Sequence, residues 1–186
     1  MSKIRFDPWV GERYHEAELH GLRILLLGES HYNAKDQDST FTQRVVEKCG
    51  QGDQRRIFFT ISAKFILQQG RGGKLSAVQR RAFWEKVAFY NYVQEIVGTK
   101  ARQRPTPEMW KRSEGAYYQV LQDLEPDLVV VLGRQLAKNL PAPVDGITMC
   151  KVNHPSSGFK YESHAQSLMS AIETAKKMKL LDAAVV

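Results

Sequence analysis

The sequence is poor in the residues from which metal centres and disulfide frameworks are built. Only two of its 186 residues are cysteines, Cys49 and Cys150. Neither belongs to a C-x-x-C pair or lies near clustered histidines, so we expect no metal site and no iron–sulfur cluster. The scarcity of cysteine also predicts reduced thiols, as in a cytoplasmic protein.

Long apolar runs are missing too. No run approaches the roughly 18 residues that cross a bilayer. The first ten residues include Asp7 and lack the apolar core of a signal peptide. We therefore expect a cytoplasmic protein that is neither secreted nor inserted into a membrane.

Acidic residues are the minority among the charged ones. The chain has 20 Asp and Glu against 27 Lys and Arg, which gives a formal net charge of +7. This bias favours polyanionic partners such as nucleic acid. With 42% hydrophobic and 25% charged residues the composition is that of a globular protein, and we expect residues 1–186 to form one domain.

Short apolar runs separated by segments of helical periodicity predict the fold. Continuous runs such as Leu128–Leu132 are typical of parallel strands that are buried on both faces. We therefore predict an α/β protein with three α/β/α layers around a central four-stranded parallel sheet. The four predicted strands are Arg23–Leu27, Lys86–Tyr90, Asp127–Leu132 and Ile147–Val152.

Two helices are predicted most clearly. Met109–Leu124 places its apolar residues on one face, and the preceding residues 106–108 supply a threonine N-cap, a first-turn proline and a first-turn acid. Ser163–Leu180 has the same periodicity, and lysines near its end complement the helix dipole.

Polar residues gather where the predicted strands end. They are Gly28–Tyr32, Asn91, Gly133–Gln135 and Asn153–Ser157. In open parallel sheets, ligands bind beyond the carboxyl ends of the strands, because loops and helix N-termini converge there. The sequence therefore predicts a site at this edge.

Two of these loops resemble motifs of a known superfamily. Gly28-Glu29-Ser30-His31-Tyr32 resembles the first, water-activating motif of the uracil-DNA glycosylases, and Asn153-His154-Pro155-Ser156-Ser157 resembles their His-Pro-Ser motif. The stretches between them follow, in order, the pattern of the iron–sulfur branch: Phe89–Tyr92, Arg104–Glu108 and Leu124–Gly133. The resemblance spans most of residues 22–170.

The resemblance implies the superfamily's fold and a DNA glycosylase that needs no cofactor. Its substrate would be uracil or another deaminated or damaged base in single- or double-stranded DNA, and we expect a monomer. His154 would donate a hydrogen bond to the departing base, Asn91 would read the edge of the flipped base, and Phe41 would supply an aromatic platform. The implied catalytic residues are His154, Glu29 and Ser30, and the implied substrate-binding residues are Gly28, His31, Tyr32, Phe41, Asn91, Asn153, Ser156 and Ser157.

The chain departs from the superfamily pattern at several positions. His31 stands where the first motif usually has proline, and Ser30 where the strongest enzymes have aspartate, which leaves Glu29 as the motif's only carboxylate. The cluster cysteines are absent. Gly158 takes the place of a leucine that wedges the duplex, with Phe159 beside it.

Other interpretations remain open. A relative without glycosylase activity could keep the crevice for binding nucleic acid or a nucleobase. His154 could be an ordinary turn residue, Asn91 a cap and Phe41 a core aromatic. Ser30 after a strand also suggests a serine hydrolase, but Tyr32 stands where a nucleophile elbow has glycine.

Overall fold

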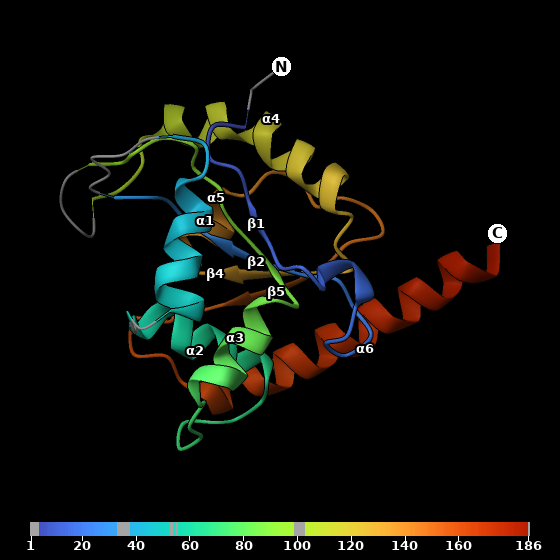
Figure 1. Ribbon diagram of the computed structural model, residues 1–186. Coiled ribbons are helices and arrows are strands. Elements are labelled where there is room, and N and C mark those ends of the chain that lie inside the picture. Colours follow the sequence, from blue (N-terminus) through green and yellow to red (C-terminus); the bar gives the residue numbers. More distant parts are fainter. Residues whose placement is uncertain (1–3, 33–37, 53, 55, 99–102, 186) are drawn as a thin grey trace.

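A computed structural model describes residues 4–32, 38–52, 54, 56–98 and 103–185 (Figure 1). They form a mixed α/β structure with a five-stranded, mostly parallel sheet and the helices α1 to α6. In chain order the elements are β1 (Trp9–Val10), the 3₁₀ turn η1 (Tyr14–Glu16), β2 (Ile24–Gly28), α1 (Phe41–Val46), the π-helical turn η2 (Glu47–Gln51), α2 (Ile57–Ile66), α3 (Ala77–Trp84), β3 (Ala88–Asn91), α4 (Pro107–Leu124), β4 (Leu128–Leu132), α5 (Arg134–Asn139), β5 (Thr148–Val152) and α6 (Tyr161–Val185).

The sheet has the order β1-β3-β2-β4-β5. The four predicted strands are present as β2 to β5 and are parallel to one another. The prediction of four strands missed β1, which pairs antiparallel with the edge of β3. Strand β1 has only two residues, which are too few to show a period-2 pattern, so no strand signal is visible after Pro8.

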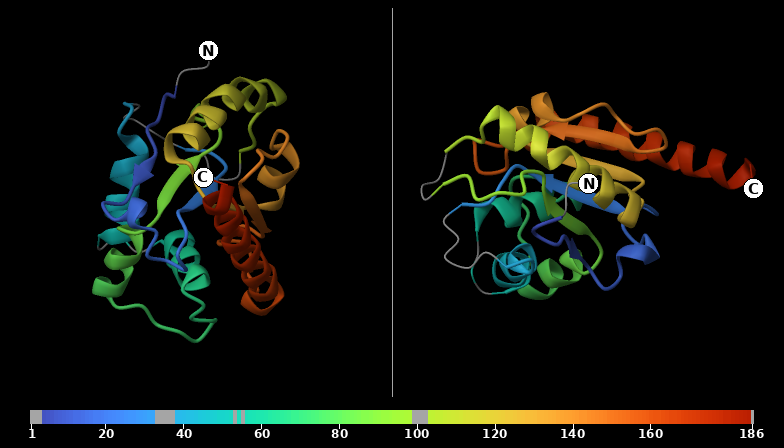
Figure 2. Two further views of the ribbon diagram at one scale, coloured as in Figure 1. Left: turned by 90° about the vertical axis from the view of Figure 1, so that its right-hand side faces the viewer. Right: turned by 90° about the horizontal axis from the view of Figure 1, so that it is seen from above.

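Helices cover both faces of the sheet, as the three-layer prediction requires (Figure 2). Alternate residues of each strand point to opposite faces, so Ile24 and Leu26 pack with α2, α3 and α6, whereas Leu25 and Leu27 pack with α4 and α5. Each face has its own aromatic cluster. Trp84 anchors the first cluster and Trp110 the second.

The two predicted helices are confirmed. The hydroxyl of Thr106 accepts a hydrogen bond from the amide of Met109 at 3.3 Å, as an N-cap should, and α4 ends at Leu124 as predicted. Helix α6 begins two residues earlier and ends later than predicted. It runs back along the sheet, where Lys179 bonds Asp127 at 3.2 Å, and its end projects from the body (Figure 1).

The chain connections create a switch point in the sheet. After β2 the chain moves to β3 on one side, and after β4 it moves to β5 on the other side, although β2 and β4 are neighbours. Loops leaving in opposite directions open a crevice at the carboxyl ends of two such strands. Gly28 and Gly133 stand at these two ends.

Both cysteines are free and buried, and burial raises the pKa of the Cys150 thiol to about 11. Among the described residues, none of the helices combines the length and apolar character that crossing a bilayer demands.

Candidate functional site

The loop after β2 is built around the buried side chain of His31. This imidazole is 5% exposed. Its Nε2 lies 3.0 Å from Thr42 Oγ1, and Asn91 Nδ2 lies 3.2 Å from both ring nitrogens. Both partners are satisfied when Nε2–H donates to Thr42 and Nδ1 accepts from Asn91. Burial lowers the pKa of His31 to about 4, so this ring is neutral at neutral pH.

Aromatic rings close the other sides of His31. The ring of Phe41 lies edge-on at 4.7 Å between centroids, and that of Phe6 at 5.1 Å. Phe41, the predicted platform, is half-buried, and its ring contacts His31 of the first motif. Gln94 fixes the backbone of the segment that carries Phe6, because its Oε1 accepts hydrogen bonds from the amides of Arg5 and Phe6 at 3.0 and 2.9 Å.

Asn91 stands beside Gly28 at the end of the neighbouring strand. The two residues are register partners in β2 and β3. The carboxamide oxygen of Asn91 occupies the space that a Cβ on residue 28 would need, so a larger residue there would displace the Asn91 side chain. Asn91 is 7% exposed, and its side chain lies against His31 of the first motif.

The loop after β5 fixes the tautomer of His154. The amide of Ser156 donates to His154 Nδ1 at 3.2 Å, and the amide of Ser157 donates to the His154 carbonyl at 2.9 Å. A neutral imidazole that accepts at Nδ1 carries its proton on Nε2. Burial, and then the nearby positive charge of Arg104, lower the pKa of His154. The ring is therefore a neutral donor, while the Ser156 and Ser157 side chains are exposed.

Phe58 contacts the second motif, and Arg104 contacts the first. The ring of Phe58 lies 5.3 Å from His154 and 5.9 Å from Phe89, and Phe89 in turn closes over Gly28. Arg104 Nη1 lies 3.1 and 3.2 Å from the two carboxylate oxygens of Glu29. Arg104 and Phe58 were missed by the sequence analysis as site residues, since only the fold brings them there.

A second arginine and a second histidine support Asn153. Arg134 Nε donates to Asn153 Oδ1 at 2.7 Å, and the Asn153 amide donates to His164 Nε2 at 3.3 Å. Burial and the charge of Arg134 lower the pKa of His164. Asn153 thus orients the loop that carries His154. No signal in the sequence singled out His164, which lies on a helix of ordinary periodicity.

Ser30 and Tyr32 complete the first motif. The hydroxyl of Ser30 is buried and has no hydrogen-bond partner among the described residues, whereas Tyr32 is half-buried. A serine nucleophile needs a base within hydrogen-bond reach. Within the described part of the chain no histidine is hydrogen-bonded to Ser30, which argues against a serine hydrolase.

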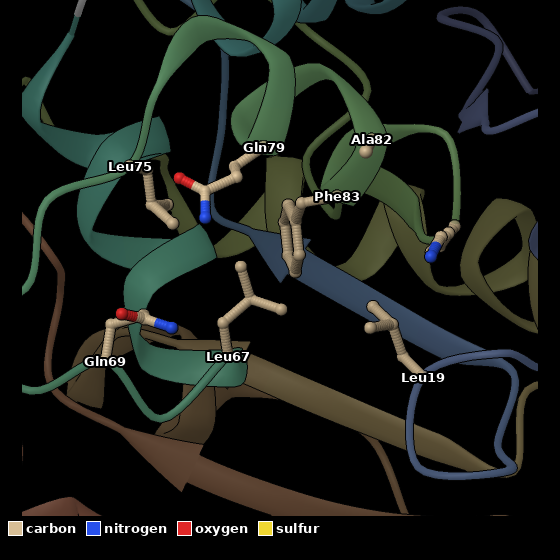
Figure 3. Close-up of a pocket in the computed structure, with 8 residues that line it drawn as sticks. Leu19, Leu67, Gln69, Leu75, Gln79, Ala82 and Phe83 are labelled. Atoms are coloured by element: carbon tan, nitrogen blue, oxygen red, sulfur yellow. The ribbon is translucent and has the colours of Figure 1, made fainter.

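A cavity of about 200 Å³ lies away from this edge, near the amino ends of β2 and β3 (Figure 3). Two of the polar side chains that line it have partners elsewhere. Lys86 pairs with Glu18 at 2.7 Å, and Gln79 accepts a hydrogen bond from the backbone amide of Ser76 at the start of α3. It is lined by Leu19, Leu67, Gln69, Leu75, Gln79, Ala82, Phe83 and Lys86. The polar and titratable side chains of the candidate site lie at the carboxyl edge of the sheet instead.

The described residues hold no group of three or more His, Cys, Asp and Glu side chains placed to bind a metal ion. No family model and no curated protein matches the chain.

Proposed function

We propose that this chain is a DNA glycosylase with the fold of the uracil-DNA glycosylase superfamily. It would hydrolyse the N-glycosidic bond of uracil or another deaminated or damaged base. The observation that carries the proposal is His154, a neutral imidazole with its proton on Nε2, beside the switch point of the sheet. There it can stabilise negative charge on a departing base.

The neighbouring side chains suit the recognition of a base that has left the stack. The carboxamide of Asn91 carries a donor and an acceptor that suit a base edge; Nδ2 contacts His31 and Oδ1 lies against Gly28, so the side chain has to turn to read a base. The ring of Phe41 lies 4.7 Å from the ring of His31, between centroids, and adds an aromatic surface beside the loop. A flipped base is held by such edge contacts and aromatic surfaces.

The chemistry needs only water as co-substrate. The bond between C1′ and the base nitrogen breaks, and its electron pair leaves with the base, whose oxygen accepts a hydrogen bond from His154 Nε2–H. Water oxygen bonds to C1′, and its proton passes to a base such as the Glu29 carboxylate and then to the departed base. The hydrogen bond from His154 strengthens as charge develops, so it favours the transition state over the ground state.

A second candidate function is binding of nucleic acid or a nucleobase without hydrolysis. It is favoured by the ion pair of Glu29 with Arg104, which engages both oxygens of the motif's only carboxylate. Ser30, which stands where the strongest enzymes have aspartate, also favours binding without hydrolysis.

Base release from defined oligonucleotides separates the two candidates. Purified protein is incubated with end-labelled strands that carry one uracil, hypoxanthine or xanthine, and abasic sites are then cleaved with alkali. We expect a break at one lesion that is lost in His154→Ala and kept in His15→Ala, an exposed histidine at the opposite edge of the sheet. A folded protein that binds these strands but releases no base contradicts the glycosylase and favours the binding function.

A further inference from the structure

Two exposed arginines, Arg104 and Arg134, flank the site in the same way. Each uses one nitrogen to hold a motif residue: Arg104 Nη1 holds Glu29, and Arg134 Nε holds Asn153. The Arg104 side chain is 64% exposed, and Arg134 is exposed as well. Within the described part of the chain, the remaining guanidinium nitrogens of both residues make no hydrogen bond, so they can serve an incoming ligand.

The two arginines hold residues at two different strand ends. Glu29 follows β2 and Asn153 follows β5, with β4 between these strands. Two strand spacings separate the held residues by about 10 Å. Arg104 and Arg134 also lie close enough to His154 and His164, respectively, to disfavour protonation of these rings. Each of the two rings, His154 and His164, therefore has a positive charge nearby.

The chemistry of these groups selects the ligand. A guanidinium presents a planar fork of donors that matches the oxygens of a phosphate, and it keeps its charge at any physiological pH. The Arg104 side chain is largely exposed although Glu29 is only 10% exposed, so a phosphate can approach the guanidinium from the solvent side without displacing Glu29. A chain with a net charge of +7 attracts the same kind of ligand from a distance.

We propose that Arg104 and Arg134 form a phosphate clamp for one DNA strand, gripping its backbone on both sides of the nucleotide that enters the site. The inference rests on the location of the proposed glycosylase site. It concerns strand binding, so it can be tested without base release.

The test is the salt dependence of binding. Affinity for a fluorescent single strand with a stable abasic analogue is measured by anisotropy between 50 and 200 mM salt. We expect Arg104→Gln and Arg134→Gln each to weaken binding about 10-fold at low salt. Each should also reduce the slope of log affinity against log salt by about 0.7, the value of one phosphate contact on a single strand. Arg13→Gln is the matched control, because Arg13 also pairs with glutamates but lies by the amino end of β3.

Two further variants separate a phosphate contact from a positioning role. Arg104→Lys keeps the charge and should keep the slope. Glu29→Gln removes the negative charge that faces Arg104 and keeps a hydrogen-bond acceptor, so binding should stay the same or tighten. If the arginine merely positioned the Glu29 carboxylate, binding would weaken as in Arg104→Gln.

The clamp is overturned if both glutamine variants keep the wild-type slope, if the wild-type protein binds no DNA, or if it binds only RNA of the same sequence. Reduced slopes in a protein that releases no base would support the clamp and contradict the proposed glycosylase.

Discussion

The two motif histidines, His31 and His154, lie at the same edge of the sheet in different surroundings. His31 is 5% exposed, with both nitrogens near protein partners and aromatic rings on its sides. His154 is half-buried, and only its Nδ1 has a partner among the described residues. A ring whose donors and acceptors are all used internally stabilises the loop. A ring with one free N–H can act on a ligand, so the comparison favours a structural role for His31 and is consistent with the chemical role proposed for His154.

The largest expected effect is that of His154→Ala on base release. Loss of one preorganised donor to a developing anion lowers kcat by about 10²–10³-fold. The midpoint of thermal unfolding should stay close to that of the wild type, because the side chain is half-buried and holds only one loop contact. Single-turnover base release and calorimetry measure the two quantities. A large loss of stability with unchanged base release would instead give His154 a structural role.

The pH dependence of stability tests His31. Its folded pKa is about 4, below the ordinary value of 6.5, so the unfolded chain binds more protons between these values. The contribution of His31 is complete above pH 6.5 and is lost as the pH falls towards 4, by about 3 kcal/mol in all. Urea unfolding at several pH values should therefore show a shallower decline in His31→Gln than in the wild type. Equal declines would mean that the ring is accessible to water.

Thr42→Val removes the hydroxyl that faces His31 Nε2 while keeping the shape of the side chain. Thr42 is fully buried, so an unsatisfied imidazole nitrogen should lower the free energy of unfolding by about 1–3 kcal/mol. Thr174→Val is the matched control, since Thr174 lies exposed on α6 and should change stability by less than about 0.5 kcal/mol. Similar losses of unfolding free energy in both variants would show that the contact between Thr42 and His31 adds no stability of its own.

The smallest expected effect concerns the charge beside His154. Arg104→Gln should raise the pKa of His154, because burial and Arg104 both lower it in the wild type. An NMR titration of the ring Cε1 proton measures the midpoint. The midpoint of His31, whose pKa is lowered by burial alone, should not move. An unchanged His154 midpoint would show that Arg104 is too far away or too well solvated to matter.

Local patterns in the sequence predicted most of the sheet and the edge at which the polar residues of the candidate site gather. Runs such as Leu128–Leu132 are apolar at every position, and that property alone identifies a central strand. The capping residue Thr106 likewise fixed the start of α4. What could not be predicted depends on contacts between distant residues. Arg104 reaches Glu29 across 75 positions, and Gln94 holds Arg5 across 89.

The same limit explains why the burial of His31 was not predicted. His31 and His154 each follow a strand within a short polar motif, and the resemblance implied contact with substrate for both. Phe6, which covers His31, comes from the N-terminal segment, and Phe58, which contacts His154, comes from α2. Burial of a loop residue is decided by such remote neighbours.

The sheet also separates two natural fluorophores. Trp84, fully buried, lies 5.3 Å from Phe59 on one face, and Trp110, 8% exposed, lies 5.5 Å from Tyr92 on the other. With Trp9 replaced by phenylalanine, removing either remaining indole leaves an emitter on a single face. The emission of these two variants during denaturation would report whether the helices on opposite sides of the sheet detach together or in sequence.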